Sequence, residues 1–151
     1  ALALEAVRDE VAEVFATALV LDRVERTGDG DVEIEVAADR LFAHGTAQLL
    51  PGTEAILARV VAVLEKRPAG FRYEMDVLVG RTDARSETGG EEVQRAGALV
   101  RAFVASGALP SGLSAGIERR DGGRVRILLR LFADARPHDR FGAGFGAAVQ
   151  P

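Results

Sequence analysis

Two residues of opposite charge near the middle of the chain, Asp83 and Arg95, have the chemical types and the spacing of a ligand site. The alternating run that begins at Val77 predicts a strand, which delivers Gly80, Thr82 and Asp83 to its end. A polar loop follows, and the next helix brings Arg95 back toward Asp83. A carboxylate binds an ammonium group, and a guanidinium binds a carboxylate in a bidentate geometry. The pair therefore predicts a site for a zwitterion.

The helix that carries Arg95 adds a second attraction for an anion. Its apolar positions run from Val93 to Val104, and Gly107 and Pro110 end it, so Arg95 is expected in the first turn. The first N–H groups of a helix have no partner inside the helix, and the helix dipole places partial positive charge there. A ligand carboxylate at this point would gain from Arg95 and from the dipole together.

Asp83 and Arg95 also have two ordinary structural interpretations. An exposed Asp–Arg pair across a loop is a surface salt bridge, worth about 0–1 kcal/mol. An Asp at the end of a strand can also cap the turn that follows. The residues alone leave these alternatives open beside the ligand site.

Further segments with the periodicity of strands or helices supply a framework for the pair. The Asp29-Gly30 turn between two alternating runs predicts a β-hairpin. Thr53 is expected as the N-cap of a long helix that ends before Pro68. Apolar residues alternate in two more strands. The expected segments are the hairpin strands 20–24 and 32–36, the helix 53–64, and the strands 73–79 and 124–132.

The first segment of the chain predicts an amphipathic helix. Its apolar residues follow one another at alternating spacings of three and four, which is a heptad pattern. One interpretation is a helix that packs on its own domain. The other is a homodimer seam, or a linker that descends from a membrane segment, and so short a run does not decide between them. The seam residues are Leu4, Val7, Val11, Val14, Ala18 and Leu21.

The motifs resemble those of one family of cell-wall proteins. The central motifs resemble the OmpA-like peptidoglycan-binding domain, which also forms the C-terminal part of the flagellar stator protein MotB. These motifs are a strand, Gly-x-Thr-Asp at 80–83, a loop, and Arg-Ala at 95–96 at the start of an apolar helix. The run Leu-Phe-x-x-Gly-Thr-Ala at 41–47 resembles the family's entry to its first long helix, where Phe42 would fill the core. The stretch 122–127 corresponds to the start of the family's closing strand.

The resemblance implies a fold and a division of the chain. The expected fold is α+β, an OmpA-like two-layer sandwich in which two long helices cover one face of a mixed sheet of about four strands. The elements are expected in the order β-α-β-α-β, with an additional N-terminal helix. We expect a linker or dimerisation helix at 1–21, the OmpA-like domain at 22–133, and a tail rich in Gly, Ala and Pro at 134–151.

The resemblance also implies a function and a setting. The domain would bind the diaminopimelate stem peptide of peptidoglycan through Asp83, Arg95, Thr82 and Gly80. It would anchor an envelope or flagellar-stator complex to the wall, as a homodimer in the periplasm. A membrane segment absent from this chain would tie it to the inner membrane and to a membrane-embedded partner.

The chain departs from the family pattern near the expected ligand. Loop 84–94 is shorter than in the family and lacks its Asn and its Leu-Ser, and Gly122 and Gly123 replace an Asn and an Arg. The connection 112–123 lacks the usual excursion with Gly and Pro. The fold needs none of these residues, whereas the ligand pocket can need them. The alternative function is therefore a diverged OmpA-like module for dimerisation or protein–protein interaction, with weak or no peptidoglycan binding.

The composition argues against other functional classes. A net charge of −4 and a pI near 5.3 do not supply the basic face of a nucleic-acid binder. The absence of cysteine excludes a disulfide framework and a thiolate metal site. No Ser–His–acid spacing and no phosphate-binding loop is present, and His44 has no partner at metal or triad spacing, so we expect no catalysis, no metal and no cofactor.

Overall fold

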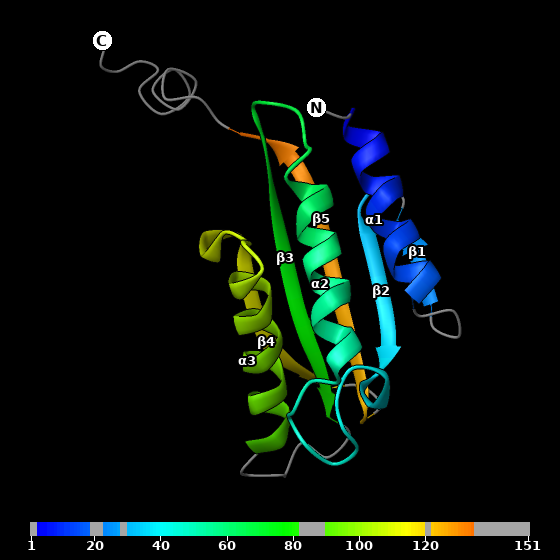
Figure 1. Ribbon diagram of the computed structural model, residues 1–151, viewed down its shortest axis with the longest axis vertical. Helices are drawn as coiled ribbons and strands as arrows, with labels where there is room; N and C mark the ends of the chain where they lie inside the picture. The colour runs from blue at the N-terminus through cyan, green and yellow to red at the C-terminus, as the bar shows by residue number, and fades with distance from the viewer. Residues whose placement is uncertain (1–2, 19–22, 28–29, 82–89, 120–121, 135–151) are drawn as a thin grey trace.

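The alternating apolar segments form a five-stranded sheet in the computed structural model, which describes residues 3–18, 23–27, 30–81, 90–119 and 122–134 (Figure 1). One-turn 3₁₀ helices at Ala38–Arg40 and Pro110–Gly112 interrupt two of the connections. The main elements, in chain order, are α1 (Leu4–Ala18), β1 (Arg23–Arg26), β2 (Val32–Ala37), α2 (Pro51–Leu64), β3 (Phe71–Arg81), α3 (Gly90–Ala105), β4 (Leu113–Arg119) and β5 (Arg124–Ala133).

The expected α+β sandwich is confirmed. The strand order is β1-β2-β5-β3-β4, with β3 and β4 parallel and the other neighbours antiparallel. All three α-helices lie on one face of the sheet (Figure 1), and every second residue of β2, β3 and β5 is buried beneath them. Among the helices of the described ranges, none has both the length and the apolar character that a membrane crossing requires.

One strand was missing from the sequence interpretation. The connection after Gly112 contains β4, which joins the edge of the sheet beside β3. Its burial does not alternate clearly, because only Leu113 and Ile117 among its seven residues are large and apolar. This extra strand corrects the expected β-α-β-α-β order. The parallel crossover over α3 ends in β4, so β5 returns antiparallel between β2 and β3.

The N-terminal helix packs on its own domain. Val7 and Val11 are fully buried and Val14 is nearly so, because α1 lies against α2, β1 and β2. Three central residues of the heptad seam are therefore already covered within one chain, which favours the first of the two interpretations of this helix. Leu21, the last seam residue, lies outside the described ranges.

Two arginines fasten α1 to the sheet. Arg8 donates from Nη2 to the carbonyl oxygen of Leu131 in β5, at 3.1 Å. Arg26 in β1 binds the carboxylates of Glu5 at 2.7 Å and Asp9 at 2.5 Å. The hydrogen bond from Arg26 holds the pKa of Glu5 below its ordinary value of 4.5. These contacts join the helix to the edge strand β1 and to the central strand β5.

The start of α2 differs from the expectation. The helix begins at Pro51, a residue that suits a first turn because its missing N–H has no intrahelical acceptor there, and Leu50 is the N-cap. Thr53 is therefore not the N-cap. Its side chain is buried, and its hydroxyl donates to the carbonyl oxygen of Leu41 at 2.8 Å. Thr53 thus ties α2 to the loop that precedes it.

The burial of Val11 predicts the result of Val11→Asp. An unpaired carboxylate in the core should lower the free energy of unfolding by about 3 kcal/mol or more. Urea denaturation followed by circular dichroism would measure the loss. Ala6→Asp, at an exposed position of the same helix, should leave the urea midpoint nearly unchanged. A folded Val11→Asp variant with an unchanged urea midpoint and half the wild-type mass in light scattering would instead support the homodimer interpretation of α1.

The lowered pKa of Glu5 predicts a pH-dependent contribution to stability. A carboxylate whose pKa is lower in the folded state stabilises that state above its unfolded pKa, and this contribution disappears as the pH falls through the folded pKa. Glu5→Gln should therefore reduce the urea midpoint at pH 7 and have little effect at about pH 3. Glu13→Gln is the control, because Glu13 on the same helix accepts from the Thr17 hydroxyl. A Glu5→Gln effect that is equal at both pH values would contradict the prediction.

Candidate functional site

Four segments meet at one end of the sheet: the carboxyl end of β3, the carboxyl end of β4, the loop 41–50 before α2, and the first turns of α3 (Figure 1). Gly80 is the penultimate residue of β3, is buried, and is paired with Glu118 of β4. Thr82 and Asp83 follow directly but lie outside the described ranges.

Arg95 is the buried cation of this site. It is 7% exposed, its Nε donates to the carbonyl oxygen of Thr46 at 2.7 Å, and its Nη2 lies 2.8 Å from the carboxylate of Glu91. Its guanidinium also stacks over the ring of Phe42, 5.2 Å from the ring centre. Because α3 begins at Gly90, Arg95 lies in the second turn of the helix, which corrects the expected first-turn position.

The loop that receives Arg95 is built around the Leu-Phe-x-x-Gly-Thr-Ala motif. Phe42 is fully buried, so its expected role in the core is confirmed. A bridge pairs Phe42 with Leu49, and Gly45 takes a positive φ of 72° that suits glycine at the tip. The hydroxyl of Thr46 donates to the carbonyl oxygen of Ala43 at 2.8 Å, which leaves the Thr46 carbonyl directed to Arg95.

The structure therefore joins two of the sequence motifs and leaves one pairing as a prediction. Arg95 contacts the 41–47 motif directly, and Gly80 lies at the same end of the sheet. The proximity of Asp83 to Arg95 stays a prediction. Sequence reasoning missed Glu91 as the partner of Arg95, although their spacing of four residues on a helix is a recognised signal for an ion pair.

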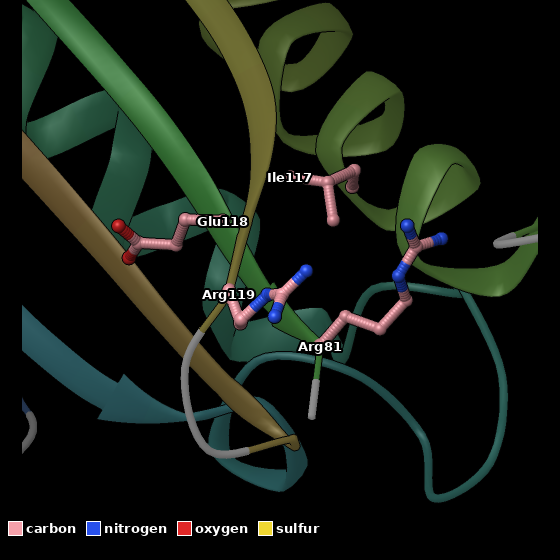
Figure 2. A pocket seen from close by; sticks show the side chains of 4 residues that line it. All are labelled: Arg81, Ile117, Glu118 and Arg119. Carbon is pink, nitrogen blue, oxygen red and sulfur yellow. The ribbon is translucent and has the colours of Figure 1, made fainter. Parts of the chain in front are cut away.

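A small pocket opens beside this site, between the last residues of β3 and β4. Its volume is ≈ 210 Å³, and Arg81, Ile117, Glu118 and Arg119 line it (Figure 2). Arg81 and Arg119 are paired in the parallel register, and their side chains lie on the helix-covered side with Ile117. The pocket is therefore rich in positive charge. It was absent from the sequence interpretation because β4 was absent from it.

Glu118 points away from the other pocket residues (Figure 2). On the open face of the sheet its carboxylate accepts from Nε and Nη2 of Arg126, at 3.1 and 2.7 Å. This bidentate contact raises the pKa of Arg126 above its ordinary value. Among the described residues, no three carboxylates or histidines lie close enough together to hold a metal ion.

The contacts of Arg95 predict a structural cost when it is removed. Arg95→Ala should lower the free energy of unfolding by about 1–3 kcal/mol, because the Thr46 carbonyl loses a charged donor and Glu91 loses its counterion. Arg101→Ala, at an exposed position of the same helix, should change it by less than about 0.5 kcal/mol. Urea denaturation of both variants tests this, and equal midpoints would contradict it.

Comparison with known proteins shows a likeness in structure. No family model matches the sequence, and no curated protein matches it. The crystal structure of a MotB-like protein from Desulfovibrio vulgaris is 17% identical, with a TM-score of 0.60, over 88% of this chain and 93% of that one. A structure described as the cell wall anchor of the T6SS from Pseudomonas aeruginosa is 16% identical, with a TM-score of 0.61, over 84% of this chain and 99% of that one.

The periplasmic domain of Helicobacter pylori MotB shows the same likeness. It is 14% identical, with a TM-score of 0.55, over 82% of this chain and 86% of that one. At such identities the likeness concerns the fold, and it extends over most of each chain. The chain therefore has the OmpA-like fold of MotB-type domains.

Proposed function

We propose that this domain is a non-catalytic anchor that binds the diaminopimelate stem peptide of peptidoglycan. The observation that carries the proposal is the position of Arg95, a buried guanidinium held in place at the end of the sheet where β3 ends. Gly80 belongs to the last residues of β3, and Thr82 and Asp83 follow that strand in the sequence. In the proposed complex Asp83 binds the ammonium group of diaminopimelate and Arg95 binds its carboxylate. Thr82 and Gly80 shape the backbone between them.

The contacts of Arg95 support this assignment because they fix its position before a ligand arrives. The Thr46 carbonyl, the Glu91 carboxylate and the Phe42 ring restrict the guanidinium on three sides. A binding group that is already ordered loses little conformational entropy when the ligand binds. Neither a carboxylate paired with an ammonium group nor a permanently charged guanidinium acts as a general base, so the arrangement suits binding rather than catalysis.

The descriptions of two structural neighbours support a setting for the proposal. The Pseudomonas aeruginosa neighbour is described as a cell wall anchor, and the Helicobacter pylori neighbour as a periplasmic domain. We place this chain in the periplasm as well, tied to an envelope or stator complex in the inner membrane by a segment before α1. A homodimer remains part of the proposal, although it would need a surface other than Val7, Val11 and Val14, which are buried within one chain.

His44 does not alter the non-catalytic assignment. Its Nδ1 lies 3.2 Å from the carboxylate of Asp39, a partner that its spacing in the sequence did not reveal. The imidazole is 90% exposed, so water competes for this contact. The pair is best described as a surface interaction of the loop before α2.

The second candidate is an interaction module that keeps the fold and has weak or no affinity for the wall. The shortened loop 84–94 and the glycines at 122 and 123 favour it, because residues that orient the peptide backbone in the family are replaced. Binding to purified peptidoglycan distinguishes the two candidates directly.

The anchor predicts that the domain co-sediments with purified sacculi that contain diaminopimelate. Asp83→Asn should reduce the bound fraction at least tenfold, because it leaves the ligand's ammonium group without a counterion. Arg95→Lys should also weaken binding, because an ammonium group cannot form the bidentate contact of a guanidinium. Densitometry of pellet and supernatant at low salt measures both effects.

Arg59→Gln is the matched control, since Arg59 is exposed on α2 and carries the same charge as Arg95. It should bind as the wild type does. Wild-type protein that stays in the supernatant at low salt would contradict the anchor and support the interaction module.

A further inference from the structure

The two edges of the sheet differ in charge. The edge strand β1 is short, and three of its four residues, Arg23, Glu25 and Arg26, are charged. Charged residues on an edge strand discourage pairing with another chain. At the other edge, the four central residues of β4, 114–117, carry no charge. Among the described strands only β3 pairs with β4, so the outer side of β4 is open to a further strand.

The helix beside this edge presents an apolar side. α3 is the outermost helix, over β3 and β4 (Figure 1). Ala98 and Ala105 face α2, because they line pockets shared with that helix. With about 3.6 residues per turn, Val93, Val100 and Val104 lie on the other side of α3, toward the outer edge of β4. Val93 is 56% exposed and Val104 is 38% exposed. The open strand edge and the exposed valines therefore face the same direction.

We infer that this side of the domain is the interface between two copies of the chain, joined by antiparallel pairing of their β4 strands. The two sheets then form one continuous sheet, and the two α3 helices pack against each other above the junction. This inference rests on the homodimer that the proposed function includes, and it names the surface of that homodimer. It does not depend on peptidoglycan binding.

The spacing of the elements favours a second copy over an extended peptide. α3 contacts β3 and β4 alike, so its axis lies over the boundary between these strands. Neighbouring strands are about 4.8 Å apart, which places the two α3 axes about 10 Å apart across a two-fold axis between the β4 strands. Packed helices have axes about 8–10 Å apart. A single peptide strand could pair with β4 but would leave the valines of α3 exposed.

A two-fold axis at Gly116 gives a register in which no like charges face each other. The facing pairs between the two copies are Glu118 with Ser114, Ile117 with Ala115, and Arg119 with Leu113. α3 and β4 have similar lengths, about 24 Å and about 23 Å, so the same axis passes near the middle of α3. The two helices then run antiparallel, and Val93 of one copy approaches Val104 of the other.

Disulfide cross-linking tests the register. The chain has no cysteine, so a single introduced cysteine can form a disulfide only with another copy. Gly116→Cys places two cysteines at the axis, where facing Cα atoms are about 4.5–5.5 Å apart, within the reach of a disulfide. A Cβ at this position meets only the Leu78 side chain, at 3.5 Å, which is ordinary contact. After mild oxidation, a non-reducing gel should show a covalent dimer.

Ser114→Cys is the matched control for the register. Ser114 is exposed and lies on the same face of the same strand as Gly116. Its two Cα atoms would be about 14 Å apart in the proposed dimer, too far for a disulfide. This variant should remain monomeric on the gel.

Sedimentation equilibrium without peptidoglycan tests the contribution of the helices. Val93→Glu should raise the dissociation constant of the dimer about tenfold or more, because it buries a carboxylate in the interface. Ala105→Glu, exposed on the α2 side of the same helix, should change it by less than about twofold. Combining Val93→Lys with Val104→Glu should give tighter association than Val93→Glu alone, because opposite charges face each other across the axis. Circular dichroism checks that each variant is folded.

Each outcome decides the inference. A wild type that is monomeric at the highest soluble concentration, with no disulfide dimer of Gly116→Cys, would overturn it in favour of a different partner for this edge. Cross-linking of Ser114→Cys as rapid as that of Gly116→Cys would overturn the register. Equal effects of Ala105→Glu and Val93→Glu would overturn the choice of this side of α3.

The failure of this inference is distinguishable from the failure of the anchor. A monomeric wild type that binds sacculi would overturn the interface and leave the anchor intact. A wild type that forms the predicted dimer and stays in the supernatant with sacculi would support the interface and overturn the anchor.

Discussion

The burial of one guanidinium determines how the end of the domain with the candidate site is built. Arg95 is 7% exposed, and a charge removed from water to this extent is stable only where hydrogen bonds and opposite charge replace the water. The Thr46 carbonyl and the Glu91 carboxylate supply these contacts, and the Phe42 ring supplies an electron-rich surface. Because Thr46 belongs to the loop before α2 and Glu91 to α3, the same side chain fixes the loop against the helix. The position of the guanidinium is thus set in part by the core, through Phe42.

The charge of the neighbouring pocket depends on strand register in the same way. Successive residues of a strand face opposite sides, so a shift of β4 by one residue would place Glu118 beside Arg81 and turn Arg119 to the open face. The bidentate contact between Glu118 and Arg126 opposes that shift, since it holds the acid on the open face. An ion pair on one face of the sheet therefore helps to keep Arg81 and Arg119 together on the other.

The parts of the fold that the sequence predicts are those with a strong local pattern. The second hairpin strand, the long helix before Pro68 and the strand 124–132 have clear periodicity, and each forms close to its expected bounds. The first hairpin strand, expected at 20–24, is described from Arg23 to Arg26, and residues 20–22 lie outside the described ranges. β4 was not predicted, because an edge strand with few apolar residues has no clear alternation. At the site, the motifs at 41–47 and 95–96 were both recognised in the sequence, but their contact through the Thr46 carbonyl was not predicted. A backbone acceptor depends on loop conformation rather than on residue type.

The heptad pattern of α1 was ambiguous for a related reason: the same apolar stripe suits a second chain or the helix's own domain, and only packing against α2 decides.

The docking of α1 has a consequence for how such a domain would transmit force. α1 begins at the end of the sheet opposite to the loop 41–50 and the carboxyl ends of β3 and β4 (Figure 1). A membrane segment before α1, as proposed, would therefore leave the domain at the end farthest from the proposed wall site. Tension between membrane and wall would then act along the strands, across α1 and its contacts with the sheet. The ion pairs of Arg26 with Glu5 and Asp9, and the bond from Arg8 to the Leu131 carbonyl, join α1 to both β1 and β5. Load applied at the helix would thus reach the central strand β5 directly. From β5 it would pass to its neighbour β3, the strand that contains Gly80.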